Sequence, residues 1–323
     1  MTHAIEVTEH GGSDVLAWVE KPVGTPGPNQ VRIKSTAVGL NFIDVYFRTG
    51  LYPSETPFIP GKEGAGIVME LGEGVTNVAV GDRVAYCNLM GTYAEEVIAN
   101  SELLAKLPDG ISDEIAASIM LKGLTAHYLL CLTYPLKKGE TILFHAAAGG
   151  VGLIACQWAK QIGATVIGTV GSPEKAELAK ANGCDHTILY RDEDFVERVK
   201  EITGGKGVDV VYDSIGKDTF EKSLDCLKKR GMMVSFGNAT GPVAIPNLGV
   251  LAAKGALYVC RPTLFTYIDT PEAFAENCDV LFGMVESGKI NITIGQKFAL
   301  KDAAKAHDAL EGRATVGSTL LIP

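Results

Sequence analysis

The middle of the chain alternates between short apolar runs and segments with helical periodicity. Its pattern predicts strands at 141–147, 165–170, 186–190, 208–213 and 231–237, and helices at 150–162, 173–182, 193–203 and 217–229. In the first helix, apolar residues recur at three- and four-residue spacing from Val151 to Ile162, which is typical of a helix with one buried face. Strands that alternate with helices predict a parallel sheet with right-handed crossovers, and therefore an α/β fold.

The two ends of the chain have a different pattern. Short alternating runs at 30–38, 66–72 and 82–86, separated by turns rich in Gly and Pro, predict a mainly β, barrel-like domain over the first 120 residues. After a further strand near 257–260 we expect a long amphipathic helix at 271–286, a strand, a helix at 302–310 and a last strand at 318–322. We interpret this C-terminal part as returning to the first domain.

The junction between the first central strand and its helix carries the strongest chemical signal. Here the apolar run stops at small residues, with the spacing Ala147-x-Gly149-x-x-Gly152. Such a turn allows close approach of the backbone to a pyrophosphate, and the helix that follows directs its N–H groups and positive dipole end at the phosphates. A Gly-rich turn alone is a weak signal, but strand, turn, helix and strand within about thirty residues favour a dinucleotide-binding unit.

Size and charge narrow the choice of function. A chain of 323 residues is long enough for two domains. The formal net charge of −9 disfavours a nucleic-acid-binding role, which requires a basic surface. We found no apolar run of about 18 residues and no signal segment, so we expect no membrane span and a cytoplasmic location. The seven cysteines are scattered, as is typical of reduced, structural cysteines.

Three segments give the chain a recognisable resemblance. They are the block Gly39–Pro53, the turn Ala146–Gly152 and the run Tyr258–Thr263. Over its whole length the sequence resembles the medium-chain dehydrogenase/reductase superfamily, and within it the zinc-free NADPH:quinone oxidoreductases that include zeta-crystallin. The resemblance implies a Rossmann, doubly wound parallel sheet domain at 124–263 and a GroES-like, mainly β catalytic domain formed by 1–123 and 264–323. It also implies a homodimer.

The chain differs from the zinc-dependent relatives at the positions of their metal ligands. Lys62 occupies the place of a histidine ligand, and Asn41 occupies the place of a cysteine ligand three residues before Asp44. An ammonium and an amide are unsuitable for a tetrahedral zinc site, which requires thiolate, imidazole or carboxylate ligands. The four-cysteine structural zinc lobe is also missing, and the six histidines show no ligand-like spacing. We therefore predict no metal.

The end of the second central strand favours NADPH over NADH. No carboxylate stands there to bind a ribose 2′-OH, and Ser172 and Lys175 offer a hydroxyl and a cation instead. The alternative is that 173–175 form only the solvated first turn of a helix. The resemblance implies a larger set of cofactor-binding residues: Asn41, Thr125, Gly149, Gly150, Val151, Gly171, Ser172, Lys175, Tyr190, Ser214, Phe236, Gly237, Leu264, Phe265, Thr266 and Arg313. Phe236 has an alternative role as a core residue.

The expected reaction is zinc-independent hydride transfer from NADPH to a quinone. Quinone reduction gives an aromatic product, so it is favourable without a Lewis acid, and the protein has to position the acceptor in a dry interdomain cleft. Asn41, Tyr46 and Tyr52 are the candidate catalytic residues. The tyrosines could hold the ring and the three polar groups could stabilise a phenolate-like oxygen. A surface-exposed, purely structural role is the alternative for each tyrosine.

Two other functions remain open. One is reduction of 2-alkenals or enones with the same hydride geometry, and the other is a non-catalytic, crystallin-like NADPH-binding role. The sequence does not determine the physiological acceptor or whether one or two electrons are transferred at a time.

Overall fold

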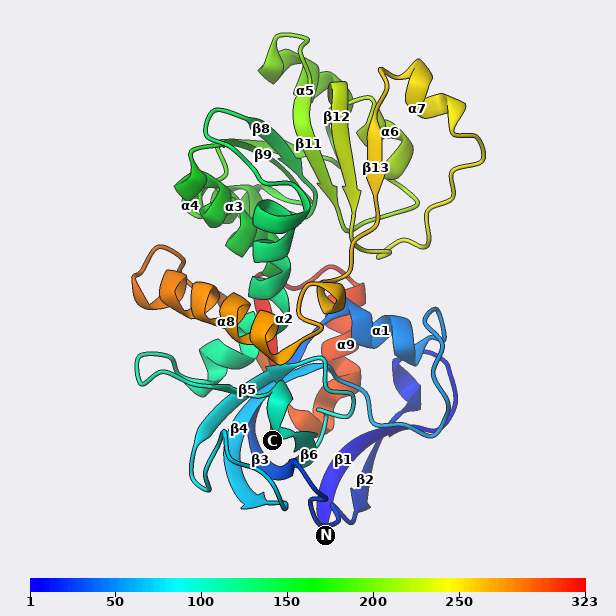
Figure 1. Ribbon diagram of the computed structural model, residues 1–323. Coiled ribbons are helices and arrows are strands. Elements are labelled where there is room, and N and C mark those ends of the chain that lie inside the picture. The colour runs from blue at the N-terminus through cyan, green and yellow to red at the C-terminus, as the bar shows by residue number, and fades with distance from the viewer. The chain divides into compact units, whose positions relative to one another are not determined.

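The computed structural model describes all 323 residues, which divide into two compact units. Unit 1 contains residues 1–124, 268–288 and 292–323, and unit 2 contains residues 125–267 and 289–291. Both chain ends belong to unit 1 (Figure 1).

Unit 1 is built around a bent, mainly antiparallel sheet. The sheet has the order β14-β15-β3-β4-β5-β7, with β6 paired to β3, and β1 pairs with β2 in a separate ribbon. The strands are β1 (Thr2–Val7), β2 (Leu16–Lys21), β3 (Gln30–Leu40), β4 (Glu63–Leu71), β5 (Arg83–Cys87), β6 (Glu96–Asn100), β7 (Ala105–Lys106), β14 (Ile294–Ala299) and β15 (Ser318–Ile322). Alternating apolar residues such as Val31, Ile33 and Val97 fill the core of this barrel-like sheet.

The helices of unit 1 flank this sheet. They are η1 (Ser13–Val15), α1 (Phe42–Arg48), η2 (Ser101–Leu103), α2 (Asp113–His127), α8 (Pro271–Glu286), η5 (Leu300–Asp302) and α9 (Ala303–Glu311). A second core joins β1, β15 and α9 through residues including Ile5, Leu321 and Ala306. Helix α8 has the predicted bounds, with Pro271 in its first turn and the Thr270 side chain as its N-cap.

Unit 2 is a six-stranded parallel sheet with the order β10-β9-β8-β11-β12-β13. The strands are β8 (Thr141–Phe144), β9 (Thr165–Val170), β10 (His186–Leu189), β11 (Val208–Asp213), β12 (Leu227–Ser235) and β13 (Tyr258–Cys260). Helices α3 (Gly150–Ile162), α4 (Pro173–Ala181), α5 (Phe195–Thr203), α6 (Phe220–Leu224) and α7 (Gly249–Ala253) surround the sheet (Figure 1). The π-helix η3 (Tyr128–Thr133) directly follows α2, and η4 (Leu264–Thr266) is a single 3-10 turn.

The strand order defines where a ligand is expected in unit 2. From β8 the chain proceeds outward to β9 and β10, then crosses back to β11 and continues to β12 and β13. The doubly wound α/β fold predicted from the sequence is therefore confirmed. Its reversal point lies between β8 and β11, and in such sheets ligands bind at the carboxyl ends of the strands beside this point.

The largest error of the sequence prediction in unit 2 is the helix expected at 217–229. Helix α6 is only five residues long, and β12 already begins at Leu227 instead of 231. Leu227 pairs with Val208 of β11, and Arg230 adopts a left-handed conformation (φ 62°) within the strand. The charged run Lys228–Arg230 looked like the end of a helix because it is polar, but it is the exposed start of a strand.

One helical segment, Asp113–Thr133, is long and apolar enough to cross a membrane by length and composition alone. The sequence pattern does not predict it as a membrane span, because Lys122 interrupts the apolar run. Of its most apolar stretch of 18 residues, 78% is buried inside the protein, as is typical of a core helix.

Candidate active site

The turn after β8 has the geometry of a phosphate cradle. A Cβ atom on Gly152 would lie 2.4 Å from the carbonyl oxygen of Ala146, so only glycine permits this packing of α3 against the turn. Ala146 itself is left-handed (φ 55°), and its carbonyl accepts a 2.9 Å hydrogen bond from the Gly149 N–H. Gly149 is the N-cap of α3, so Gly150 and Val151 lie in the first turn, where N–H groups have no partner within the helix. The residues fit a bound pyrophosphate.

A buried network of polar side chains lies next to this turn. His145 is held between the Thr169 hydroxyl, 3.0 Å from Nδ1, and the Ser223 hydroxyl, 2.9 Å from Nε2. Ser223 in turn donates to Asp213 at 3.4 Å, and burial lowers the pKa of His145. Although Ser, His and Asp meet here, the carboxylate contacts the serine instead of the histidine, and all three are buried. The set is a structural link between β8, β9, β11 and α6, not a nucleophilic triad.

The end of β9 brings together the residues predicted to recognise the 2′-phosphate. Ser172 is the N-cap of α4 and accepts a hydrogen bond from the Lys175 backbone N–H at 3.4 Å. Its hydroxyl also lowers the pKa of the exposed Glu174 carboxyl. A Cβ on Gly171 would lie 3.0 Å from the Tyr190 hydroxyl oxygen, so the Tyr190 side chain lies beside Gly171. No carboxylate ends β9, as the sequence indicated.

The ends of β11 and β12 place three more predicted residues at the same edge. A Cβ on Gly237 would be 2.5 Å from the Ser214 carbonyl oxygen, so these two backbones are in close contact. The Phe236 ring packs on Phe144 with 5.8 Å between ring centroids, which agrees with its alternative role as a packing residue. Of the other predicted cofactor residues in unit 2, Thr125 is buried in α2, and Leu264, Phe265 and Thr266 form η4.

In unit 1 the predicted acceptor-binding tyrosines lie together. The Tyr46 and Tyr52 rings are 5.1 Å apart with an interplanar angle of 58°. Phe47 meets Tyr52 edge-on at 5.7 Å, and Phe42 lies 6.3 Å from Tyr46. The Tyr52 N–H donates to the Tyr46 carbonyl at 3.0 Å, which folds the segment after α1 back onto the helix. Aromatic edges and faces are therefore grouped as a flat acceptor ring requires.

Asn41, the third predicted catalytic residue, is the N-cap of α1. Its side chain accepts from the Asp44 N–H, and the Asp44 carboxylate accepts from the Asn41 N–H at 2.9 Å, which completes a capping box. The Asn41 amide nitrogen donates to the Gly39 carbonyl at 3.3 Å and to Glu63 Oε2 at 2.9 Å. Both amide hydrogens are thus used inside the protein. Its predicted role as a donor to substrate stays a prediction.

Glu63 is the centre of a second buried network. Its Oε2 also accepts from the Lys122 ammonium at 2.8 Å, and its Oε1 accepts from the Leu121 N–H at 2.7 Å. The Glu63 side chain is fully buried and that of Lys122 is 7% exposed. A buried carboxylate is tolerated because these donors satisfy its oxygens. The network ties β4 to α2 and, through Asn41, to α1.

Behind α1 a chain of hydrogen bonds runs through the interior of unit 1. Arg48 is 1% exposed; it donates to His307 Nδ1 at 3.0 Å and pairs with Glu311 at 2.9 Å. Because Arg48 is always a donor, His307 carries its hydrogen on Nε2 and donates to the Tyr93 oxygen at 3.1 Å. The Tyr93 hydroxyl then donates to Asp44 Oδ2 at 3.0 Å.

Burial sets the protonation states of Asp44 and His307 in this hydrogen-bond chain. It raises the pKa of Asp44 to about 7, against the hydrogen bonds from Asn41 and Tyr93, and the other Asp44 oxygen, Oδ1, makes no hydrogen bond. Burial, and then the charge of Arg48, lower the pKa of His307 to about 3, which agrees with its neutral state in the chain.

The ligand chemistry for a metal ion is missing from the described chain. Nowhere do three His, Cys, Asp or Glu side chains gather so that they could hold a metal ion. Lys62 lies beside the aromatic cluster, with its Nζ 5.3 Å from the centroid of the Phe47 ring. Arg313, predicted to add charge to the cofactor site, is an exposed, left-handed residue (φ 57°) after α9 in unit 1.

Sequence reasoning missed the buried polar residues that hold α1 in place. They are Arg48, Glu63, Tyr93, Lys122 and His307. Only Glu63 carried a local signal, because it lies in the Pro-Gly-Lys-Glu segment that drew attention to Lys62. The partners of the others are up to 263 residues away in sequence, so no spacing could reveal them.

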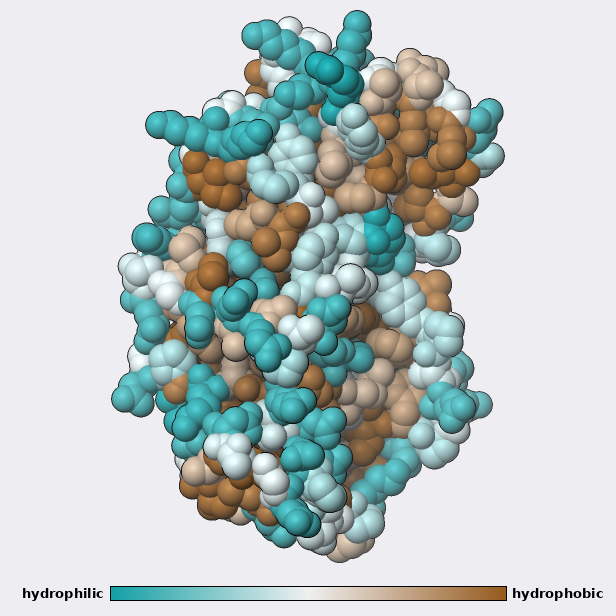
Figure 2. Space-filling model, in the orientation of Figure 1, coloured by the Kyte–Doolittle hydropathy of each residue, from teal (hydrophilic) through white to brown (hydrophobic).

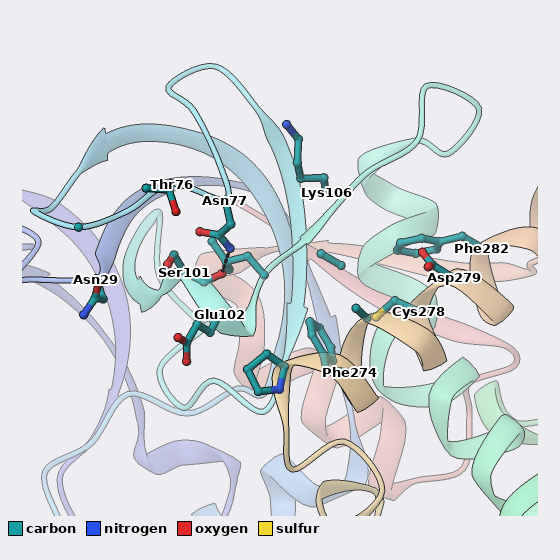
Figure 3. A pocket seen from close by; sticks show the side chains of 15 residues that line it. Asn29, Thr76, Asn77, Ser101, Glu102, Lys106, Phe274, Cys278, Asp279 and Phe282 are labelled. Atoms are coloured by element: carbon teal, nitrogen blue, oxygen red, sulfur yellow. Dashed lines mark hydrogen bonds between the residues drawn. The ribbon is translucent and has the colours of Figure 1, made fainter.

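Unit 1 also contains a hollow of ≈ 450 Å³ between η2 and α8. Figure 3 shows Phe274, Cys278 and Phe282 from α8 on one side and polar side chains including Asn77 and Glu102 on the other. None of the predicted site residues lines it. It is therefore separate from the candidate active site.

Comparison with known proteins gives consistent matches over the whole chain. The alcohol dehydrogenase GroES-like domain family matches residues 27–109, and the zinc-binding dehydrogenase family matches residues 150–272. The chain is 55% identical to a quinone oxidoreductase of Pseudomonas aeruginosa over the full length of both, and 46% identical to a 2-haloacrylate reductase of a Burkholderia species over 100% and 99% of the two chains. The crystal structure of Escherichia coli quinone oxidoreductase complexed with NADPH superimposes with a TM-score of 0.98 at 52% identity, covering 99% of this chain and 100% of that one.

The buried Asp44 predicts a pH-dependent stability difference between the wild type and Asp44→Asn. The pKa of Asp44 rises from 3.8 to about 7 on folding, so the folded state binds the proton more tightly. Wild-type stability should therefore fall relative to the variant as pH rises from about 4 to 7, by up to roughly 4 kcal/mol. Urea unfolding at several pH values measures this difference. His307 contributes a slope of opposite sign, but it is present in both proteins and cancels.

The matched control is Asp302→Asn. Asp302 is partly exposed beside Lys305, and its pKa is lowered, so its stabilising effect is lost only below about pH 4, as pH falls. A wild-type-minus-D44N difference that stays constant from pH 4 to 8 would contradict the buried-carboxyl interpretation.

Proposed function

This chain belongs to the quinone oxidoreductases of the medium-chain dehydrogenase/reductase superfamily, and from that membership we propose that it transfers a hydride from NADPH to a quinone without a catalytic metal. The observation that carries the proposal is the close-packed turn at Gly152, at the carboxyl edge of the parallel sheet beside its reversal point. NADPH, when bound, supplies the hydride from C4 of its nicotinamide ring. The residues of this chain bind the cofactor and the acceptor, orient them and exclude water.

We assign NADPH binding to unit 2. Gly149, Gly150 and Val151 bind the pyrophosphate with the N–H groups of the first turn of α3. Gly171, Ser172, Lys175 and Tyr190 surround the 2′-phosphate, because the end of β9 offers hydroxyls and a cation and no carboxylate. The remaining predicted contacts are Thr125, Ser214, Phe236, Gly237, Leu264, Phe265 and Thr266 in unit 2, and Asn41 and Arg313 in unit 1.

We assign the acceptor to the aromatic cluster of unit 1. The Tyr46 and Tyr52 rings provide apolar faces for a quinone ring. We assign their hydroxyls to orienting the quinone rather than to obligatory proton transfer. Asn41 holds the start of α1, and with it Tyr46, through the capping box and Glu63. The catalytic advantage expected from such positioning is mainly entropic.

Reduction of an activated carbon–carbon double bond is the second candidate. One observation favours it: the relative from Burkholderia is named for an acrylate, a compound with such a bond. The chemistry of hydride delivery is the same for both acceptor classes, so the choice rests on the acceptor-binding residues.

The homodimer also stays a proposal. Strand β13 is an edge strand, and Tyr258 on it is 57% exposed. Figure 2 shows apolar residues gathered at the upper right, over α7 and beside β13, and Leu248 there is 71% exposed. Pairing of two β13 edges would cover these groups, and a single-chain mass by light scattering would contradict it.

We propose a cytoplasmic location, which agrees with seven cysteines that are all free. Recovery of the native protein from a secreted or periplasmic fraction would contradict it.

An acceptor panel tests the main proposal. Chelator-treated enzyme should oxidise NADPH with para-quinones at a higher kcat/KM than with α,β-unsaturated aldehydes or acrylates, because no metal takes part. NADPH absorbance measures the rate, and metal analysis is made on the same sample. Loss of turnover on chelation that stoichiometric zinc restores would contradict metal independence, and a preference for the double-bond acceptors would favour the second candidate.

Nucleotide preference tests the assignment of the 2′-phosphate site. The kcat/KM for NADPH should exceed that for NADH, and Lys175→Met should lower the ratio about fivefold to tenfold through loss of one charge near the phosphate. Lys180→Met, at an exposed lysine in the last turn of the same helix, is the control and should leave the ratio unchanged. A wild-type ratio at or below one would contradict the assignment.

Replacement of both Tyr46 and Tyr52 by Phe tests their role. Because the rings remain and only the hydroxyls are lost, turnover should slow modestly, by roughly tenfold or less. Steady-state kinetics with a para-quinone measures the effect. Complete loss of activity with unchanged NADPH affinity would show instead that a tyrosine transfers an essential proton.

A further inference from the structure

The loop before β4 fixes the direction of Lys62. Gly61 is left-handed (φ 100°), and a Cβ on it would lie 2.3 Å from both Thr92 Oγ1 and Tyr93 Cδ1. This close contact holds the loop against Tyr93, the residue that hydrogen-bonds Asp44. Glu63 then points into the core and is fully buried, whereas Lys62, its neighbour in an extended segment, is only partly buried.

Lys62 brings a positive charge to the aromatic cluster. Its ammonium lies 5.3 Å from the centroid of the Phe47 ring, and Phe47 contacts Tyr52, which in turn packs on Tyr46. These are the rings to which we assigned the acceptor. The ammonium therefore lies at the aromatic cluster to which we assigned the acceptor, next to its Phe47 ring.

Two titratable groups, Asp44 and Cys87, act on Lys62. Burial lowers its pKa from 10.5, while Asp44 and Cys87 act in the opposite direction. Two other cations of this region have structural roles: Lys122 pairs with Glu63, and Arg48 with Glu311 and His307.

Quinone reduction creates a requirement that Lys62 can meet. The hydride brings two electrons but only one proton, so the acceptor becomes an oxyanion and needs a donor. Of the three donors expected from the sequence, the Asn41 amide already gives both of its hydrogens to Gly39 and Glu63, and the Tyr46 and Tyr52 hydroxyls are neutral donors without the charge of an ammonium.

Resting on the proposed function, we propose that Lys62 is the catalytic acid of the reduction: its ammonium binds the acceptor oxygen that becomes negative and protonates it. The quinone takes a hydride from NADPH and becomes the hydroquinone monoanion. One N–H bond of the ammonium breaks and one O–H bond forms on the product. The neutral amine of Lys62 then takes a proton from water, which restores the starting state.

The acid strengths match. A phenol has a pKa of about 10, and burial lowers the pKa of the Lys62 ammonium from 10.5, which favours proton transfer to a phenolate. Acid catalysis of this kind is most efficient when donor and acceptor have similar pKa values.

The kinetic test compares Lys62→Met with Lys62→Arg and the wild type. The methionine variant should lose about 10²-fold in kcat with a para-quinone, since it lacks both charge and proton, and its NADPH dissociation constant should not change. Wild-type kcat should fall as pH rises through the pKa of Lys62, and the methionine variant should lack this fall. Added ethylammonium should partly restore Lys62→Ala. Lys301→Met, at an exposed lysine in η5, is the control and should match the wild type.

A second readout needs neither NADPH nor turnover. 4-Nitrophenol resembles the phenolic product, and its absorbance reports its ionisation. The wild type and Lys62→Arg should both lower the pKa of bound 4-nitrophenol by about one unit, and Lys62→Met should not. Arginine keeps the charge but cannot release a proton, so Lys62→Arg should still lose turnover.

These measurements distinguish the possible failures. A wild type that never oxidises NADPH with any quinone refutes the proposed function, and the catalytic role of Lys62 with it, even where 4-nitrophenol still responds to residue 62. An active wild type whose Lys62→Met variant keeps kcat within threefold, or keeps the wild-type pH profile, refutes the role of Lys62 alone.

Discussion

The complete burial of the Glu63 carboxylate constrains the whole candidate acceptor site. A charge in that position is tolerated only when strong donors surround it, and the chain supplies Lys122, the Leu121 N–H and the Asn41 amide. Two of these donors come from α2 and the third from the start of α1, so satisfying one carboxylate fixes the start of β4, the middle of α2 and the start of α1 relative to one another. Helix α1 has only seven residues and would be unstable alone, and this anchoring explains how it can hold Tyr46.

In unit 2 a different physical interaction, close backbone packing, fixes the candidate cofactor site. The turn after β8 is held by close backbone contact of Gly152 with Ala146, and the ends of β11 and β12 by close contact of Gly237 with Ser214; any larger residue at either glycine would clash. A neutral histidine, His145, links the strands beneath the turn through two hydroxyls. The cofactor side thus depends on small residues and the acceptor side on satisfied buried charges. Small residues leave a recognisable spacing in the sequence, whereas buried charges do not.

This difference explains what could be predicted. The periodicity gave the bounds of α3 and α8 and the parallel order of the central strands, because the burial of one helix face or one whole strand repeats locally. It failed at α6 and β12, where the polar run Lys228–Arg230 is the exposed start of a strand, and polar character alone does not distinguish that from a helix end. The hydrogen-bond chain from Asp44 through Tyr93 and His307 to Arg48 could not be predicted from the sequence, because its members meet only through tertiary folding.

Two networks of buried polar and charged groups contact one short helix, and removing these groups from water costs stability. This cost bears on function. Buried charges seldom stabilise a protein more than well-packed apolar residues would, so stability alone gives little reason for the buried Glu63–Lys122 pair, or for the buried guanidinium of Arg48, whose partner Glu311 is 37% exposed. What such pairs provide is fixed geometry, because a slightly displaced partner leaves a charge unsatisfied. Fixed geometry matters most where a hydride must be delivered to one atom and a proton to another. The charges that hold α1 therefore provide a rigid support for the proposed acceptor site, where the proposed mechanism requires a polar group to change protonation.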